Sequence, residues 1–460
     1  MPTLSTSTTK FGTAVGYPKP ENMQYYRPIS LLNTMCKLLE KIIDARLRTN
    51  YLTPQQNGFR KHRSTYNSLQ DIQKNIKKTL YNKQVLGLVS LDIAKAYDTT
   101  WRPDILKKLQ NILCNGNMLN FIKDFLSDRS FQVKINNFLS STFNQQNDVP
   151  QGSTISVTLF LIAINDICEN IKFPVQSTLF ADDLNILCRG KNLNSIQPAL
   201  QNTINSLTQW SSKTGFTFSA LKSRCTLFTR LRKHKKLDLS LNNTPIPYSK
   251  TIKILGITFD NKSTWQAHLK EIRKATLIKL NIIKLLAHTS WGANGTSLKQ
   301  IYKSLILSKL EYGAFLLSDV KQSSLKMIET IHNSGLRFAI GAFRSSPITS
   351  ILTTANTLPL DLIILQNAIL QKTRSAQNNF TPNSENIIKF NNFEFNSSEI
   401  LKHEIPIYPP WAMELHANID LSQHVKRETM EIRFRNLAHS ILEEYQDHSI
   451  IPMDLKLKQE

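Results

Sequence analysis

The sequence lacks the cysteine pattern of a disulfide-stapled or zinc-binding protein. Its 460 residues include five cysteines, an odd number, and no two of them form a CxxC pair. Isolated cysteines of this kind favour a reducing compartment. They also argue against a cysteine-based zinc module. The cysteines are Cys36, Cys114, Cys168, Cys188 and Cys225.

Long apolar runs and a secretory signal are also missing. The longest apolar stretch, from Val157 to Ile164, falls well short of the roughly 18 residues that a membrane span needs. The N-terminal residues contain no apolar segment of the kind that a signal peptide requires. We therefore expect an intracellular protein, in the nucleus or the cytoplasm, that is neither secreted nor bound to a membrane.

Acidic residues are few relative to basic ones. Lys and Arg total 57 against 34 Asp and Glu, which gives a formal net charge of +23. Hydrophobic residues make up 41% of the chain, which excludes a wholly disordered protein. Any single basic cluster is most simply a solvated surface, but the total favours a nucleic-acid partner. The clusters are Lys61–Arg63, Lys74–Lys78, Arg230–Lys236 and Lys270–Lys284.

The spacing of apolar residues predicts two regions that differ in secondary structure. Up to about Phe259, strand-like and helical patterns alternate, and Val85–Asp92 is predicted as a buried strand. After Asp260 the chain is predicted to be mostly α-helical, followed by a linker over 378–398 and one more helix over 427–445. The expected helices of this half are Trp265–His288, Ser297–Leu317, Leu325–Phe343 and Leu360–Ala376.

The pair Asp182-Asp183 is the most informative polar feature. It lies between two strand-like segments, so a hairpin is predicted there. Neighbouring strand residues point to opposite faces, and the two acids can serve one site only if the chain bends sharply. Carboxylates held close together repel unless cations neutralise them, and oxygen ligands without His or Cys favour Mg²⁺ or Mn²⁺. Considered alone, the pair is more simply a solvated turn.

A third acid, Asp92, ends the predicted buried strand. A charge within an apolar run needs a partner, because burial of a lone charge is costly. Asp92 and Asp182 could hold two metal ions about 3.5–4 Å apart, which would activate an attacking 3′-hydroxyl and stabilise a leaving pyrophosphate. Asp98 is interpreted as a structural acid of a turn or cap.

Seven short blocks follow one another between roughly Pro18 and Asp260. They are Tyr26–Leu32, Gln56–Thr65, Ser90–Asp98, Val149–Phe160, Phe180–Asp183, Phe218–Ser223 and Leu255–Ile257. In this order they resemble two fingers motifs and motifs A to E of the reverse transcriptases of non-LTR (LINE-type) retrotransposons, in particular the Jockey, I and R1-like elements of animals. The stretch that follows is similar to the thumb of those enzymes.

The resemblance implies an α+β right-hand polymerase with fingers, palm and thumb and an antiparallel palm sheet. It places the fingers, with an incomplete N-terminus, over 1–82, the palm with motifs A–E over 83–260, the helical thumb and connection over 261–377, and a linker and C-terminal helical segment over 378–460. It also implies a chain truncated to the polymerase region, without the endonuclease and RNase H domains of such elements, so autonomous retrotransposition is not expected.

The resemblance further implies the residues that carry the chemistry. Asp92, Asp182 and Asp183 would ligate two Mg²⁺ ions, with the backbone carbonyl of Ile93 as a further oxygen. Lys222 would be the general acid for the departing pyrophosphate.

Substrate contacts follow from the same motifs. Tyr97 would be the steric gate that excludes a ribose 2′-hydroxyl, although without motif A around it a packed core aromatic is the better interpretation. Gln151 and Gly152 would lie under the nucleotide and template. Arg27 and Lys19 would grip the triphosphate.

The implied partners are an RNA template, a DNA primer or target and dNTPs, with the element RNA held as a ribonucleoprotein. Arg60, Lys61 and Arg63 are predicted to contact the template. Two residues depart from motif B, since Val157 replaces its usual proline and Asp148 a frequent glycine.

Two other functions stay open. An RNA-dependent RNA polymerase shares the palm, but it typically carries Gly-Asp-Asp at the hairpin and a smaller gate, so Ala181 and Tyr97 argue against it. A catalytically decayed, nucleic-acid-binding remnant would keep the basic groove without activity. The retained aspartates argue against the remnant, and the expected truncation and the motif B departures argue for it.

Overall fold

The chain divides into two units, Met1–Ile400 and Leu401–Glu460. The described residues all lie in the first unit, so the helix predicted over 427–445 lies outside them. The computed structural model describes residues 9–10, 29–30, 32–47, 51–113, 116–132, 134–135, 138–144, 147–231, 234–288, 290–318, 320–377, 387–390 and 393–396.

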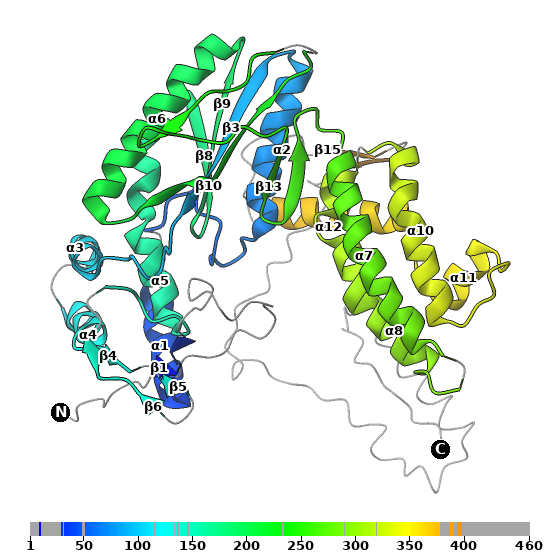
Figure 1. Ribbon diagram of the computed structural model, residues 1–460, viewed down its shortest axis with the longest axis horizontal. Helices are drawn as coiled ribbons and strands as arrows, with labels where there is room; N and C mark the ends of the chain where they lie inside the picture. The colour runs from blue at the N-terminus through cyan, green and yellow to red at the C-terminus, as the bar shows by residue number, and fades with distance from the viewer. Residues whose placement is uncertain are drawn as a thin grey trace, which may run out of the picture. The chain divides into compact units, whose positions relative to one another are not determined.

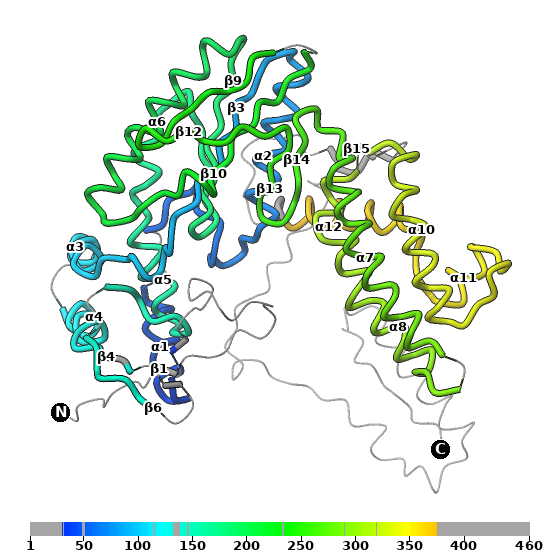
Figure 2. Tube along the Cα trace, in the orientation of Figure 1, coloured from blue at the N-terminus to red at the C-terminus, as the bar shows by residue number. Residues whose placement is uncertain are grey.

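A four-stranded antiparallel sheet of order β10-β3-β9-β8 forms the centre of the first unit (Figure 1). The predicted strand–turn–strand around Asp182 forms one edge of it as the hairpin β8–β9. Strand β3, drawn in blue in Figure 2, lies between β9 and β10, two green strands that come much later in the sequence. The strands are β3 (Val85–Ile93), β8 (Val175–Phe180), β9 (Asp183–Gly190) and β10 (Phe218–Phe228).

Strand β3 sends alternate side chains into two hydrophobic cores, because successive side chains of a strand point to opposite faces. Leu91 packs in the core that includes helix α6 (Leu193–Thr214), and Leu88 packs in the core that includes helix α2 (Thr65–Tyr81). Both helices contact the sheet, one on each side of it (Figure 1). The same alternation turns Asp92 toward the face of Leu88.

Further helices complete the core on the α6 side of the sheet. Helix α5 ends at Ala163, and the chain then tightens into the 3₁₀ helix η2. Ser153 begins α5 by accepting a hydrogen bond from the Ser156 N–H at 3.3 Å, as an N-cap residue does. The elements are α1 (Thr34–Leu47), α3 (Arg102–Leu113), α4 (Asn117–Leu126), α5 (Thr154–Ala163) and η2 (Asn165–Asn170).

The segment that closes the first half is a tight hairpin. Ile254 pairs with Ile257, and the intervening Leu255 and Gly256 both have positive φ, 47° and 82°, as a two-residue hairpin turn requires. The remaining short strands pair as β1–β2, β4–β7, β5–β6, β11–β12, β13–β14 and β15–β16. Their bounds are β1 (Thr9–Lys10), β2 (Ile29–Ser30), β4 (Ser130–Phe131), β5 (Lys134–Ile135), β6 (Phe138–Leu139), β7 (Phe143–Asn144), β11 (Ser240–Leu241), β12 (Thr244–Pro245), β13 (Thr251–Ile254), β14 (Ile257–Asp260), β15 (Ile387–Phe390) and β16 (Phe393–Asn396).

The region after β14 is helical, as the sequence predicts. The stripe 297–317 is not one helix, because a π-helical turn and Gly313, at φ 75°, interrupt it. Strands β15 and β16 occupy part of the predicted linker. The helices are α7 (Gln266–Leu286), α8 (Gly295–Tyr302), η3 (Lys303–Leu307), α9 (Ser308–Glu311), η4 (Ala314–Leu317), α10 (Gln322–Ala339), α11 (Ile348–Thr354) and α12 (Leu360–Gln377).

Helix α2 joins the sheet to this helical region. The ring of Tyr66 lies 4.2 Å from that of Phe315, and the Gln73 side-chain amide donates to the Leu316 carbonyl at 3.1 Å. The central sheet and the helices around it together have the mixed α+β character that the sequence predicts. Within the described ranges, no helix is both long enough and apolar enough to span a membrane.

Candidate active site

Three acidic side chains lie at one end of the central sheet. Asp92 lies one residue from the end of β3, and Asp183 is the first residue of β9. The two strands pair up to Leu91 and Leu184, and one further step of the same register sets Asp92 against Asp183. The pairing of β3 with β9 thus brings together acids that are about ninety residues apart in the sequence.

The third acid, Asp182, lies in the turn of the β8–β9 hairpin. Phe180 pairs with Asp183, so Ala181 and Asp182 alone make the reversal. Ala181 adopts a left-handed backbone conformation, at φ 54°, and is buried. The chain therefore bends sharply enough for the two neighbouring acids, Asp182 and Asp183, to serve one site, as the sequence predicts.

The hydrogen-bonding capacity of the Asp92 carboxylate is only partly satisfied. Its Oδ2 is buried and has no hydrogen-bond partner within the described part of the chain. Desolvation raises the pKa of Asp92, the nearby charge of Asp182 raises it further, and Lys222 opposes both, with its Nζ 3.8 Å from Oδ2. A buried anionic oxygen that makes no hydrogen bond and has only a long ion pair is suited to a cation.

Asp183 shares this electrostatic environment. Desolvation of its carboxyl group and then the charges of Asp182 and Asp92 raise the pKa of Asp183 to about 6, although the residue keeps contact with solvent. No three His, Cys, Asp or Glu side chains among the described residues form a ready-made metal cluster. Mg²⁺ is commonly held by one or two carboxylates together with substrate phosphates rather than by an all-protein cage, so the donor set fits such an ion.

A bulge in β10 brings Lys222 to the acids. Ser219 pairs with Asp92 and Arg224 with Ser90, so β10 advances five residues where β3 advances two. Ser223 fixes the bulge, because its Oγ accepts from the Asp92 N–H at 3.2 Å and donates to the Ser219 carbonyl at 2.7 Å. The Lys222 side chain is 71% exposed, which leaves it able to move within the site.

The turn before α5 is held from two sides. The Gln151 side-chain amide donates to Asp98 Oδ1 at 2.9 Å. The main-chain carbonyl of Gln151 accepts from the Ser30 N–H at 2.7 Å. Asp98 therefore has the structural role predicted for it. Gly152 has φ 112°, a conformation that favours glycine.

The same turn explains one departure from motif B. Asp148 has φ 87°, in the region that glycine adopts most readily, and its residue is 7% exposed. Arg102 holds Asp148 in place. Its Nε donates to the Asp148 main-chain carbonyl at 3.0 Å, and its Nη2 lies 3.5 Å from Asp148 Oδ1. The guanidinium also donates to the carbonyls of Leu126 and Asn147, at 2.8 and 3.2 Å. An ion pair here supports a backbone that glycine would adopt without strain.

Tyr97 lies in the turn that follows β3. Its ring stacks on that of Phe160, with 4.4 Å between centroids and 18° between planes, and the residue is half-buried. This position agrees both with a gate and with a packed aromatic. The Ile93 side chain is 4% exposed and lies in the core, so only its main chain could reach a ligand.

Arg60 and Arg63 are turned toward their own loop. Arg60 Nη1 donates to the Thr53 carbonyl at 2.8 Å, and Arg63 Nη1 donates to the Gln56 carbonyl at 3.0 Å. Lys61 between them is exposed. The two guanidinium groups thus stabilise the loop before α2, and their contact with the template stays a prediction. Two further predicted contacts, Arg27 and Lys19, lie outside the described residues.

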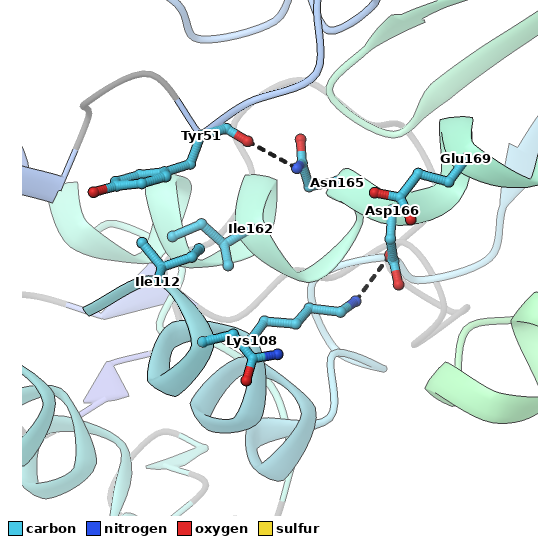
Figure 3. A pocket seen from close by; sticks show the side chains of 8 residues that line it. Tyr51, Lys108, Ile112, Ile162, Asn165, Asp166 and Glu169 are labelled. Atoms are coloured by element: carbon cyan, nitrogen blue, oxygen red, sulfur yellow. Dashed lines mark hydrogen bonds and ion pairs between the residues drawn. The ribbon is translucent and has the colours of Figure 1, made fainter. Parts of the chain in front are cut away.

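A pocket of about 260 Å³ is lined mainly by residues of α3, α5 and η2 (Figure 3). Lys108 Nζ pairs with Asp166 Oδ1 across it at 2.9 Å, and the Asn165 amide donates to the Tyr51 carbonyl at 2.9 Å. Neither the three acids nor Lys222 line this pocket, so it is not the candidate active site. The lining residues are Tyr51, Lys108, Asn111, Ile112, Ile162, Asn165, Asp166 and Glu169.

The structure gives a role to two residues that the sequence patterns did not mark: Gln56 bonds to the turn that carries Asp182, and Arg102 bonds to Asp148. Gln56 belongs to the second fingers block, but nothing in the sequence indicates that its side chain is buried. Arg102 carried no signal, because a charged residue in a helical first turn is ordinarily solvated.

Comparison with known proteins identifies the family of the chain. The family described as "Reverse transcriptase (RNA-dependent DNA polymerase)" matches residues 17–259, more than half of the chain. The chain therefore belongs to the reverse transcriptase family. The matched range contains all three acids and Lys222.

Its relatives include enzymes of insect retrotransposons. The RNA-directed DNA polymerase from mobile element jockey of Drosophila melanogaster is 28% identical, over 70% of this chain and 36% of that protein. The probable RNA-directed DNA polymerase from transposon X-element of the same fly is 26% identical, over 71% and 36%. The Pol polyprotein from type-1 retrotransposable element R1 of Bradysia coprophila is 24% identical, over 63% and 29%. The chain thus spans about a third of the length of these relatives.

Among solved structures, telomerase from Candida albicans in complex with a fragment of telomeric RNA matches 73% of this chain and 64% of that chain. The identity is 12% and the TM-score is 0.38, which is too low to bear on the fold.

Proposed function

We propose that this chain is an RNA-directed DNA polymerase of a Jockey- or R1-like non-LTR retrotransposon, which adds dNTPs to a primer 3′-hydroxyl as an RNA template directs. The single observation that carries the proposal is the meeting of Asp92, Asp182 and Asp183 at one end of the antiparallel sheet. Their mutual repulsion, in a chain of this family, supports a site built for cations.

Asp92, Asp182 and Asp183 would hold Mg²⁺, or Mn²⁺, in this function. The cation would supply charge that activates the primer hydroxyl and stabilises the leaving pyrophosphate. Lys222, next to Asp92, would deliver a proton to that pyrophosphate. The buried Oδ2 of Asp92, which makes no hydrogen bond within the described part of the chain, supports this assignment.

The remaining assignments follow the same proposal. Residues 1–82 would be the fingers, 83–260 the palm and 261–377 the thumb and connection. Gln151 and Gly152 would lie under the nucleotide. Arg27 and Lys19 would bind its triphosphate. RNA template, DNA primer and the element's own RNA would be the partners, and the net charge of +23 supports a polyanion in this role.

The test is a primer-extension assay. Purified protein with Mg²⁺, a poly(rA) template and an oligo(dT) primer is expected to incorporate dTTP, and omission of Mg²⁺ should stop the reaction. Absence of incorporation, with binding of the primer–template intact, would contradict the proposal and identify a nucleic-acid-binding remnant instead.

Replacement of Tyr97 tests the steric gate. Tyr97→Ala is expected to raise the use of rNTPs relative to dNTPs by roughly 10- to 100-fold, because the ring that would collide with a 2′-hydroxyl is removed. Single-nucleotide incorporation of UTP and dTTP measures the ratio. Tyr97→Phe keeps the ring and its stacking on Phe160, so it should match the wild type. An unchanged ratio in Tyr97→Ala would show that Tyr97 is only a packing residue.

A further inference from the structure

The side chain of Gln56 bonds directly to the turn that carries the acids. Gln56 is 1% exposed, and its Oε1 accepts from the Ala181 N–H at 2.9 Å. Its Nε2 faces the Ala181 carbonyl at 3.3 Å. The amide of Gln56 therefore pairs with both polar groups of Ala181, the residue that immediately precedes Asp182.

The main chain around Gln56 extends the sheet. The Asn57 N–H donates to the Leu179 carbonyl at 2.8 Å, and the Leu179 N–H donates to the Gln55 carbonyl at 3.0 Å. Gln56 and Leu179 form a parallel bridge. The loop thus lies against the outer edge of β8, and the Gln56 side chain continues the bonding from Leu179 to Ala181.

The close approach of the loop depends on Gly58. A Cβ at this position would lie 2.3 Å from the Ala181 nitrogen, which no side chain can tolerate. The Gly58 N–H also donates to Gln56 Oε1 at 2.8 Å, so the same oxygen receives two hydrogen bonds. Arg63 holds the Gln56 carbonyl from the other side at 3.0 Å.

The turn needs this support. Ala181 has a left-handed backbone conformation at φ 54°, which is unfavourable for a residue with a Cβ. A two-residue turn without further bonds could relax, and relaxation would change the directions of Asp182 and Asp183. Gln56 bonds to the peptide groups on both sides of the Ala181 Cα, so it selects the strained conformation.

We propose that Gln56 is a positioning residue that sets the direction of the Asp182-Asp183 pair relative to Asp92, and thereby the affinity of the site for its divalent cation. This inference rests on the proposed function for its consequence in catalysis. Its structural half, the bonding of Gln56 to Ala181, does not rest on it.

Hydrogen–deuterium exchange tests the structural half without catalysis. Gln56→Met keeps the volume and removes every side-chain bond to Ala181. The Ala181 amide should then exchange about tenfold faster, the effect of one lost hydrogen bond, while peptides from β3 stay protected. Gln73→Met is the matched control, because it removes a buried amide bond to the Leu316 carbonyl far from the turn. Unchanged exchange at Ala181 in Gln56→Met would overturn the inference.

Metal dependence tests the functional half. In Gln56→Met the Mg²⁺ concentration for half-maximal incorporation should rise about tenfold, with the affinity for primer–template unchanged and no such rise in Gln73→Met. A loosened turn with wild-type Mg²⁺ dependence would overturn this half. If Gln56→Met does not fold, Gln56→Asn serves both measurements, since its amide is one methylene too short to reach Ala181. A wild-type protein without activity would refute the proposed function, and the exchange result would still decide the role of Gln56.

Discussion

Asp182→Asn is expected to abolish dTTP incorporation while leaving the affinity for nucleic acid nearly unchanged. The substitution keeps the shape of the side chain and removes one of the three charges that repel each other at the end of the sheet. Loss of a charge that holds a catalytic cation should lower the rate by roughly 10²- to 10³-fold or more. Primer extension measures the rate, and fluorescence anisotropy of a labelled primer–template measures binding.

A matched control separates this effect from a change in net charge. Asp124 is an exposed acid of α4, and Asp124→Asn makes the same chemical change away from the three acids. It should leave incorporation unchanged. If Asp182→Asn kept a rate within tenfold of the wild type, the assignment of the acids as the cation site would be wrong, whatever the family membership of the chain.

The location of the acids could be predicted because it depends on local pattern. An apolar run that ends in Asp92 and a strand–turn–strand around Asp182 are visible in the sequence, and motif order indicates that they meet. Register was not predictable in the same way, because the pairing of Leu91 with Leu184 joins residues far apart in the chain.

Contacts made by bulges and loops could not be predicted from apolar spacing, and only the resemblance to motif D indicated Lys222. Lys222 reaches Asp92 because three additional residues of β10 loop out of the ladder, which no periodicity reveals. Gln56 and Ala181 are 125 residues apart, and their bond depends on the absence of a side chain at Gly58. The bonds of the Arg60 and Arg63 guanidinium groups within their own loop have no sequence signal either.

Helix ends were predicted poorly for a different physical reason. Apolar spacing reports which residues are buried, not whether the backbone between them is continuous. The stripe 297–317 stays buried while the chain passes through a π turn and a bend at Gly313. Helix α11 has seven residues, too few for a periodic signal. Helix α5 is buried along most of its length, so the spacing of its apolar residues could not mark its end at Ala163.

Arg102→Met is expected to lower the free energy of unfolding by about 3–5 kcal/mol at pH 7, the usual cost of breaking a buried ion pair from one side. Arg102 is 7% exposed and bonds the carbonyls of Leu126, Asn147 and Asp148 as well as the Asp148 carboxylate. In Arg102→Met these oxygens lose their hydrogen bonds and their ion pair with Arg102. Urea denaturation followed by circular dichroism measures the loss. Asp148→Gly is the matched variant: glycine adopts φ 87° without strain and Arg102 keeps its three carbonyls, so the loss should be smaller.

The pH dependence of these variants separates the ion pair from simple packing. Burial raises the pKa of Asp148 from 3.8 to about 6, Arg102 and Arg129 oppose this rise, and Asp98 adds to it. The folded state therefore binds this proton more tightly than the unfolded state, and the contribution of Asp148 to stability increases as the pH falls from above 6 toward 4. Without Arg102 the pKa of Asp148 should rise further, so Arg102→Met should be more destabilising at pH 8 than at pH 5. In the Asp148→Gly background the additional Arg102→Met substitution should lose that dependence. An equal cost of Arg102→Met at both pH values would mean that the carboxylate of Asp148 is not the charge that Arg102 neutralises.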